Sequence, residues 1–292
     1  DRLHRMFFRG CMPKTVRGIP LPTLAGIKNY APSADFDYAN GSYMHTLLEK
    51  EKLTYELDVT ALLITLLDET KKSCFINVGA NISYFPVLAG AVFGPRCEIH
   101  SFEPMPELFE MGKRGLELNN VTATARQDAL ANFVGEAEFH LSAQTDSSNS
   151  LNPTFRKTKS IVTVPVSTLD KIYLEEQASP SLNEASSTDV GCVLVIDTES
   201  TEPDVIEGGA NMIAKFRPYI ICEVLAGRSE ERLMELMEGH GYSYYRLTNS
   251  GLVPEDTIVG DITYAHRDWL FAPSPLDAVT LRKYVHVFND LQ

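Results

Sequence analysis

The chain has 292 residues, of which 44% are hydrophobic and 22% are charged, as in a typical globular protein with a core. This composition excludes general disorder, and the length fits one large domain or one domain with an accessory segment. A net charge of −13 disfavours a surface that attracts phosphate backbones, so we expect no nucleic-acid partner.

The apolar runs and the cysteines indicate whether the chain spans a membrane and in which compartment we expect it. The longest apolar candidate, residues 84–93, is shorter than the roughly 18 residues of a membrane span, so we expect none. No secretory signal is visible, and the chain begins at Asp1 rather than Met, which leaves its native N-terminus undefined. The cysteines are odd in number and lack metal-site spacing, which predicts buried free thiols and a cytoplasmic protein. They are Cys11, Cys74, Cys97, Cys192 and Cys222.

Proline-containing segments, which are typical of loops and connections, suggest that the chain has three parts. Residues 1–54 are predicted to form an N-terminal arm and helical cap, residues 55–273 the main domain, and residues 274–292 a C-terminal helix. Leucines at helical spacing before residue 67 predict one or two helices there. We find no internal repeat.

The main domain alternates short apolar runs with amphipathic segments. This order predicts βαβ crossovers, a largely parallel sheet and burial of both sheet faces. Helices are expected near residues 82–92, after Pro106, after Pro203, and from Ser229 to about His240. The expected strands lie near residues 74–78, 98–102, 121–126, 161–166, 192–196, 219–224, 244–247 and 269–272.

The residues that directly follow these strands are the candidate ligand-binding residues, because ligands bind at the carboxyl ends of such strands. The first strand ends in Asn77-Val78-Gly79-Ala80-Asn81. Gly79 permits close approach of the backbone, and the next helix offers free N–H groups. The second and third glycines of a dinucleotide motif are absent, and an ordinary strand-to-helix turn explains this segment equally well.

Two further strand ends carry acidic side chains. Glu103 follows the second strand, in Phe102-Glu103-Pro104, where it could accept hydrogen bonds from two ribose hydroxyls. Asp128 follows the third strand and could accept from an adenine amino group. A solvated glutamate and a turn-forming aspartate are the alternatives.

Four more acids are expected at the same edge of the sheet. Asp197, Glu199 and Glu202 lie in one short turn after a very apolar strand, and Glu223 ends the next strand. Like charges at close range raise one another's proton affinity, which suits a general base, but oxygen ligands also suit a hard divalent cation. We predict a catalytic edge with Asp197 or Glu199 as the base, and no metal ligand. Glu202 could alternatively serve the N-terminus of the following helix.

Two histidines are weaker candidates than these acids. His100 occupies a strand position, where a hydrogen-bonded structural histidine is the usual case. His266 precedes the last strand and could face the site, although the acids are favoured over it.

Together these segments resemble the FkbM-type methyltransferase family over roughly Tyr55 to Ala272. The order and spacing of the pieces carry the resemblance. They are the run from Phe75 to Ser83, Phe102-Glu103-Pro104, Val166-Ser167-Thr168-Leu169-Asp170, the acidic run from Ile196 to Gly209, and Trp269-Leu270-Phe271-Ala272.

The resemblance implies a Rossmann-like class I methyltransferase fold for residues 55–273, with a mostly parallel seven-stranded sheet and helices on both faces. It also implies bound S-adenosyl-L-methionine and O-methylation of a small-molecule or glycan acceptor, a hydroxyl of a sugar or secondary metabolite. Asp197, Glu199 and Glu202 would face the acceptor. Gly79 and Asn81 would line the methionine end of the cofactor, Glu103 the ribose and Asp128 the adenine. The expected cofactor site comprises Asn77, Gly79, Ala80, Asn81, Glu103, Pro104, Asp128 and Ala129.

Asn77 stands where the family usually has Asp, and Ser83 and Ser200 stand where it usually has Gly. These departures motivate an alternative, a catalytically inactive binding or scaffolding protein with the same fold. A nicotinamide dehydrogenase is a third, less favoured hypothesis, because the glycine motif is incomplete. Specificity is expected from the arm and from the loops at residues 144–160 and 179–189. The sequence does not indicate an oligomeric state.

Overall fold

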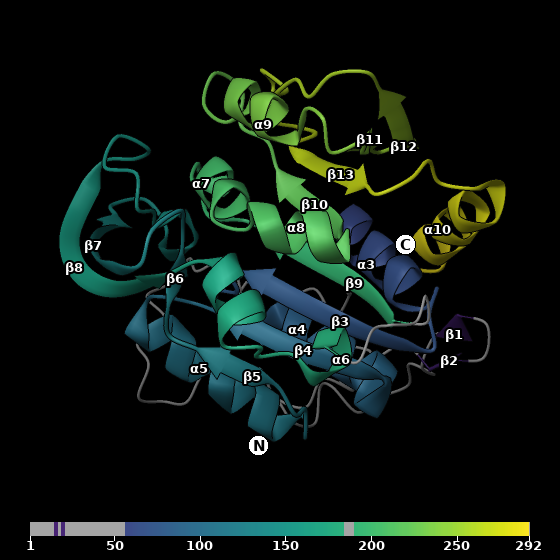
Figure 1. Ribbon diagram of the computed structural model, residues 1–292, viewed down its shortest axis with the longest axis horizontal. Coiled ribbons are helices and arrows are strands. Elements are labelled where there is room, and N and C mark those ends of the chain that lie inside the picture. Colours follow the sequence, from purple (N-terminus) through teal and green to yellow (C-terminus); the bar gives the residue numbers. More distant parts are fainter. Residues whose placement is uncertain (1–14, 17–18, 21–55, 184–189, 292) are drawn as a thin grey trace, which may run out of the picture.

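An eight-stranded sheet forms the centre of the computed structural model, which describes residues 15–16, 19–20, 56–183 and 190–291 (Figure 1). The strand order is β12-β11-β13-β10-β9-β3-β4-β5. In chain order the strands are β3 (Lys72–Val78), β4 (Cys97–Phe102), β5 (Thr124–Arg126), β9 (Val190–Ile196), β10 (Tyr219–Glu223), β11 (Ser243–Thr248), β12 (Gly251–Glu255) and β13 (Asp268–Ala272).

The sheet is parallel through its centre and antiparallel at one side. Strands β10, β9, β3, β4 and β5 run parallel, while β13, β11 and β12 join them in antiparallel ladders. The expected mostly parallel sheet is therefore confirmed. The expected number of strands is wrong by one, because β12 adds a partly exposed edge strand containing Pro254, whose ring removes the donor that most strands use.

Helices cover both faces of this sheet, as expected. Neighbouring residues of β3 show why, since Phe75 packs into one apolar cluster and Ile76 into the other. The first cluster includes side chains from α3 (Leu57–Leu67), α4 (Tyr84–Phe93), α5 (Pro106–Leu118) and α10 (Ala278–Leu291). The second includes side chains from α6 (Pro180–Asn183), α7 (Glu202–Glu207), α8 (Ala210–Phe216) and α9 (Glu230–Met237).

Most helix boundaries follow the local sequence signals. Proline occupies the first turn of α4, α5 and α7, where its missing N–H costs nothing. The last helix begins at Ala278 rather than at the expected residue 274, because Oδ1 of Asp277 accepts hydrogen bonds from the N–H groups of Val279 and Thr280. Helix α9 ends at Met237, three residues before the expected His240.

A separate three-stranded sheet stands beside the ends of β3 and β4 (Figure 1). It consists of β6 (Ala129–Leu130), β7 (Gly135–Ser142) and β8 (Thr158–Ser167), in the order β6-β8-β7. The strand expected at residues 161–166 is thus confirmed. Strand β7 was not predicted, because its residues are mostly polar and only Phe139 is fully buried.

The remaining elements are short. A two-stranded ladder joins β1 (Thr15–Val16) to β2 (Ile19–Pro20), and helical turns cover Gly94–Arg96, Asp146–Ser148 and Lys171–Glu175. Most of the expected arm and cap, with Cys11, lies outside the described residues. The four described cysteines are buried free thiols, as expected. Among the described helices, none has the length and hydropathy required to cross a bilayer.

Candidate functional site

A cavity of about 380 Å³ lies at the carboxyl ends of β3, β4, β9 and β10. Phe139 and Leu130 of the three-stranded sheet form its opposite wall. The volume is that of a pocket for a small ligand. Of the twelve residues predicted for the site, the structure brings eleven to this cavity, and Glu202 is not among the residues that line it. The eleven are Asn77, Gly79, Ala80, Asn81, Glu103, Pro104, Asp128, Ala129, Asp197, Glu199 and Glu223.

The glycine turn after β3 is shaped by the turn after β9. Gly79 has a φ of +78°, and a Cβ atom on it would lie 1.8 Å from the carbonyl oxygen of Asp197. Only glycine therefore lets these two turns meet. We expected Gly79 to make room for a ligand, but the close approach in the structure is to the protein's own backbone.

Both serines that replace the usual family glycines occupy left-handed backbone conformations. Ser83 has a φ of 60° and Ser200 a φ of 84°, which explains the glycine preference at these positions. The Oγ atoms of Ser83 and Ser101 lie 3.0 Å apart in a hydrogen bond, and the amide Nδ2 of Asn152 donates to Oγ of Ser200 over 2.9 Å. These hydrogen bonds compensate part of the backbone strain.

Glu103 is fixed by two backbone donors. The N–H of Asn81 donates to its Oε2 (2.8 Å) and the N–H of Met105 to its Oε1 (2.9 Å). Burial raises the pKa of Glu103 to about 7, although the two backbone hydrogen bonds act in the opposite direction. Each oxygen of the carboxylate still has a lone pair available for a ligand.

Asp128 shares its carboxylate with a neighbouring arginine. Nε of Arg126 lies 2.7 Å from Oδ2 of Asp128, and the same guanidinium also contacts Glu176 over 2.8 Å. The Arg126 ion pair uses Oδ2 alone, so Oδ1 is the oxygen that could accept from a ligand lining this part of the cavity.

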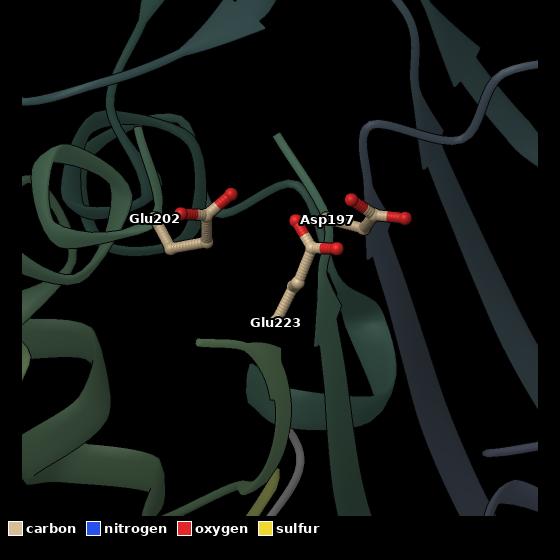
Figure 2. Close-up of side chains that lie close together, drawn as sticks. All are labelled: Asp197, Glu202 and Glu223. Atoms are coloured by element: carbon tan, nitrogen blue, oxygen red, sulfur yellow. The ribbon is translucent and has the colours of Figure 1, made fainter. Parts of the chain in front are cut away.

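Three carboxylates converge at the acidic edge (Figure 2). Asp197 follows β9, Glu202 begins α7 and Glu223 ends β10. Each contributes an oxygen to a group whose members lie within 4.8 Å of one another. The sequence prediction that acids from separate strands meet at one edge agrees with this placement.

The protonation of this edge is set by burial and by mutual repulsion. Burial, followed by the charges of Asp197 and Glu202, raises the pKa of Glu199 to about 9, and burial raises the pKa of Glu202 to about 7. Burial also raises the pKa values of Asp197 and Glu223. Arg267 opposes these shifts at Glu223, since its Nη1 lies 2.6 Å from Oε1 of that side chain.

Four buried oxygens at this site have no hydrogen-bond partner among the described residues. They are Oδ1 of Asn77, Oδ1 of Asp197, Oε2 of Glu202 and Oε2 of Glu223. A buried polar atom without a partner lowers the stability of the fold, so such atoms usually face a ligand, an ion or water. Three of the four atoms belong to residues that line the cavity, Asn77, Asp197 and Glu223, which makes it the candidate binding site.

Several residues that line this cavity are not predictable from the sequence patterns. Arg267 and Asp268 reach it because β13 runs antiparallel to β10 and pairs Asp268 with Glu223, so its amino end lies at the carboxyl edge. The order of strands in the sequence gives no sign of this reversal. The loop between β7 and β8 contributes Arg156 and the polar run Ser147-Ser148-Asn149, in the segment expected to confer specificity.

The two histidines lie outside the cavity wall. His266 is not among the residues that line it, and its backbone N–H donates to Oδ2 of Asp261 over 3.0 Å. His100 is fully buried, with its Nε2 2.8 Å from Oε1 of Glu98, as expected for a structural histidine. The described part of the second specificity segment, residues 179–183, also lies away from the cavity.

The parallel sheet, its two helical layers and the position of the cavity define a class I methyltransferase-like α/β fold. The chain belongs to the FkbM methyltransferase family, because the family's methyltransferase FkbM domain matches residues 77–244. No curated protein matches the chain.

Several solved structures are similar to the chain at low sequence identity. A methyltransferase FkbM from Methylobacillus flagellatus has 11% identity and a TM-score of 0.44, over 69% of this chain and 43% of that one. This chain thus spans less than half the length of that relative. An S-adenosylmethionine-dependent O-methyltransferase from Thermotoga maritima has 8% identity and a TM-score of 0.38, over 80% and 71% of the two chains. A precorrin-6y C5,15-methyltransferase from Geobacter metallireducens has 12% identity and a TM-score of 0.35, over 73% and 85%.

Proposed function

We propose that the protein is an S-adenosyl-L-methionine-dependent O-methyltransferase that acts on a hydroxyl of a sugar or secondary-metabolite acceptor. The observation that carries this proposal is the joint position of two sets of residues. Glu103 and the Gly79 turn lie on the same cavity as the acids after β9 and β10. A cofactor and an acceptor hydroxyl would therefore meet where buried carboxylates are available as bases.

The residues that line the cavity after β3, β4 and β5 fit the cofactor. Oδ1 of Asn77, which has no partner in the described chain, could accept from the ammonium group of the methionine end. Glu103 and Asp128 have lone pairs for the ribose hydroxyls and the adenine amino group, respectively. Ala80, Asn81, Pro104 and Ala129 supply the adjoining wall. When bound, S-adenosyl-L-methionine supplies an electrophilic methyl group on its sulfonium.

The residues that line the cavity after β9 and in the loop between β7 and β8 fit the acceptor. Asp197 and Glu199 both line it, and either side chain could take the proton of a hydroxyl group when it is ionised. Because the pKa of Glu199 is raised to about 9, Glu199 would serve as the base only at alkaline pH. The serines and the asparagine of residues 147–149 offer donors and acceptors suited to a polyhydroxylated molecule. Arg156 adds a positive charge on the same side. Methyl transfer to an oxygen needs mainly such positioning and removal of one proton.

Binding of the cofactor is the first test. The full chain would be titrated calorimetrically with S-adenosyl-L-methionine and with S-adenosyl-L-homocysteine, each with and without magnesium. We expect saturable binding in the micromolar range, which would justify a screen of hydroxyl acceptors. Absence of binding under both conditions would refute the proposal and favour the non-catalytic scaffolding protein.

The base is then assigned with isosteric variants. We expect Asp197→Asn or Glu199→Gln to lower kcat roughly 100-fold or more, because general-base catalysis contributes about that much. The matched controls are Asp256→Asn and Glu235→Gln, which remove the same charges from exposed positions. Full activity in both cavity variants would show that neither carboxylate is the base.

A further inference from the structure

Two glutamates at the acidic edge are buried with one oxygen unused. Glu202 is 0% exposed and Glu223 is 4% exposed, yet Oε2 of each has no hydrogen-bond partner within the described residues. Oδ1 of Asp197 is also buried without a hydrogen-bond partner among the described residues. Figure 2 shows the three carboxylate groups close together. Their ligand atoms lie within 4.8 Å of one another.

The second oxygen of each glutamate is fixed by the surrounding protein. Oε1 of Glu202 accepts hydrogen bonds from the N–H groups of Thr198 and Ser200, both at 3.0 Å, and from the Thr198 hydroxyl at 3.2 Å. Oε1 of Glu223 lies 2.6 Å from Nη1 of Arg267. Both carboxylates are therefore held through Oε1, and Oε2 of each is left without a partner among the described residues. Such anchoring of the outer oxygen is how proteins orient carboxylate ligands of a metal.

The spacing of the oxygens suits a hard divalent cation. Ligand oxygens on opposite sides of Mg²⁺ lie about 4.2 Å apart, and those on opposite sides of Ca²⁺ about 4.8 Å apart. The group spans no more than 4.8 Å and consists of carboxylates alone, without histidine or cysteine. Oxygen-only ligands favour Mg²⁺, Ca²⁺ or Mn²⁺ over softer transition metals.

We propose that Asp197, Glu202 and Glu223 bind a single hard divalent cation at the acidic edge. Because Asp197 and Glu223 line the cavity, the cation would face it with coordination positions left for water or an acceptor oxygen. Glu199 is outside the group of three, so it is not expected to be a ligand of the cation. The binding of the cation stands on these contacts alone, whereas its role toward an acceptor rests on the proposed methyl transfer.

Shared protons are the competing explanation for the same cluster. A carboxyl group that keeps its proton can donate to a neighbouring carboxylate, and this would also satisfy buried acids without any ion. The two explanations differ in one measurable respect, because only the first gives saturable cation binding that depends on these particular side chains.

The test is a titration of the full chain with Mn²⁺, after removal of metals by a chelator and in the absence of cofactor and acceptor. Electron paramagnetic resonance of free Mn²⁺ reports binding, and Mg²⁺ and Ca²⁺ are added as competitors. We expect a single saturable site per chain, weakened roughly tenfold or more by Glu223→Gln and by Asp197→Asn. Circular dichroism establishes that each variant is folded. Asp197→Asn suffices if Glu223→Gln does not fold, because Oδ1 of Asp197 has no partner to lose within the described chain.

The matched control is Asp268→Asn, which removes one ionisable carboxyl group from the same cavity but no member of the group. We expect it to weaken Mn²⁺ binding only a few-fold, because the Asp268 carboxylate attracts the cation without coordinating it. Equal weakening by Asp268→Asn and by Glu223→Gln, or no saturable binding at all, would overturn the proposal in favour of shared protons. Cofactor binding without Mn²⁺ binding would leave the proposed function intact, so the two failures are distinguishable.

Discussion

Among single residues, Gly79 joins the two turns that form the site. Its missing side chain lets the turn after β3 lie against the carbonyl of Asp197, and the neighbouring N–H of Asn81 fixes Glu103. One glycine thus sets the distance between the expected ribose-binding carboxylate and the acidic edge. A substitution there should disturb both halves of the cavity together.

We predict that Gly79→Ala lowers the free energy of unfolding by about 2–4 kcal/mol, because the new Cβ meets backbone and the φ is unfavourable. Gly239→Ala is the matched control, since its φ of +83° is similar and a Cβ atom there would have no neighbouring atom within 4 Å. The control should cost about 1 kcal/mol, the backbone penalty alone. Urea unfolding of both variants measures the difference, and equal losses would mean that the contact with Asp197 is easily relieved.

At the scale of elements, the loop between β7 and β8 supports the acidic turn, residues 197–202. The hydroxyl of Ser150, which is 1% exposed, donates to the backbone oxygen of Glu199 over 2.7 Å. Asn152 donates to Ser200 in the same turn. Because Glu199 and Ser200 both have positive φ values, this turn depends on outside contacts for its shape. The small sheet therefore stabilises the acidic edge as well as closing the cavity.

We predict that Ser150→Ala loosens the turn without unfolding the protein. The substitution removes the hydrogen bond to Glu199 and the acceptor of the Asn152 N–H. Loss of two hydrogen bonds is worth about 1–2 kcal/mol in total, so exchange of the Ser200 amide hydrogen should accelerate roughly 5- to 30-fold. Hydrogen–deuterium exchange measures this rate. Thr145→Ala is the control, since the described hydrogen bonds of its hydroxyl go to Ser147 and Ser148 in the same loop. Unchanged exchange at Ser200 would show that the loop does not support the turn.

The elements also show how far the sequence could predict the structure. The central strands β3, β4, β9 and β10 were predictable because their runs are apolar and end in polar turns. That rule also located the acids after β9 and β10. Strands β7 and β12 are mostly polar or exposed, so their periodicity carries little signal. Arg267 and Asp268 were missed because the direction of β13 depends on tertiary pairing, which no local pattern encodes.

Across the molecule, buried acids link folding to pH. The pKa of Glu103 is raised by burial to about 7, and that of Asp268 is raised to about 7 by burial and by the charges of Asp58 and Asp197. A glutamate in the unfolded chain has a pKa of about 4.3. Between this pH and about pH 7, the folded chain therefore binds more protons than the unfolded chain. The free energy of unfolding must then fall as pH rises through this interval.

We predict that Glu103→Gln flattens this dependence. In the wild-type protein, the stabilisation linked to Glu103 is fully present below about pH 4.3 and is lost as pH rises through about 7. The loss amounts to about 3–4 kcal/mol for this buried carboxyl, and glutamine cannot titrate. Urea unfolding between about pH 5 and pH 9 measures the two slopes, with exposed Glu107→Gln as the control. Parallel curves for wild type and Glu103→Gln would mean that Glu103 keeps its charge inside the fold, stabilised by the N–H groups of Asn81 and Met105.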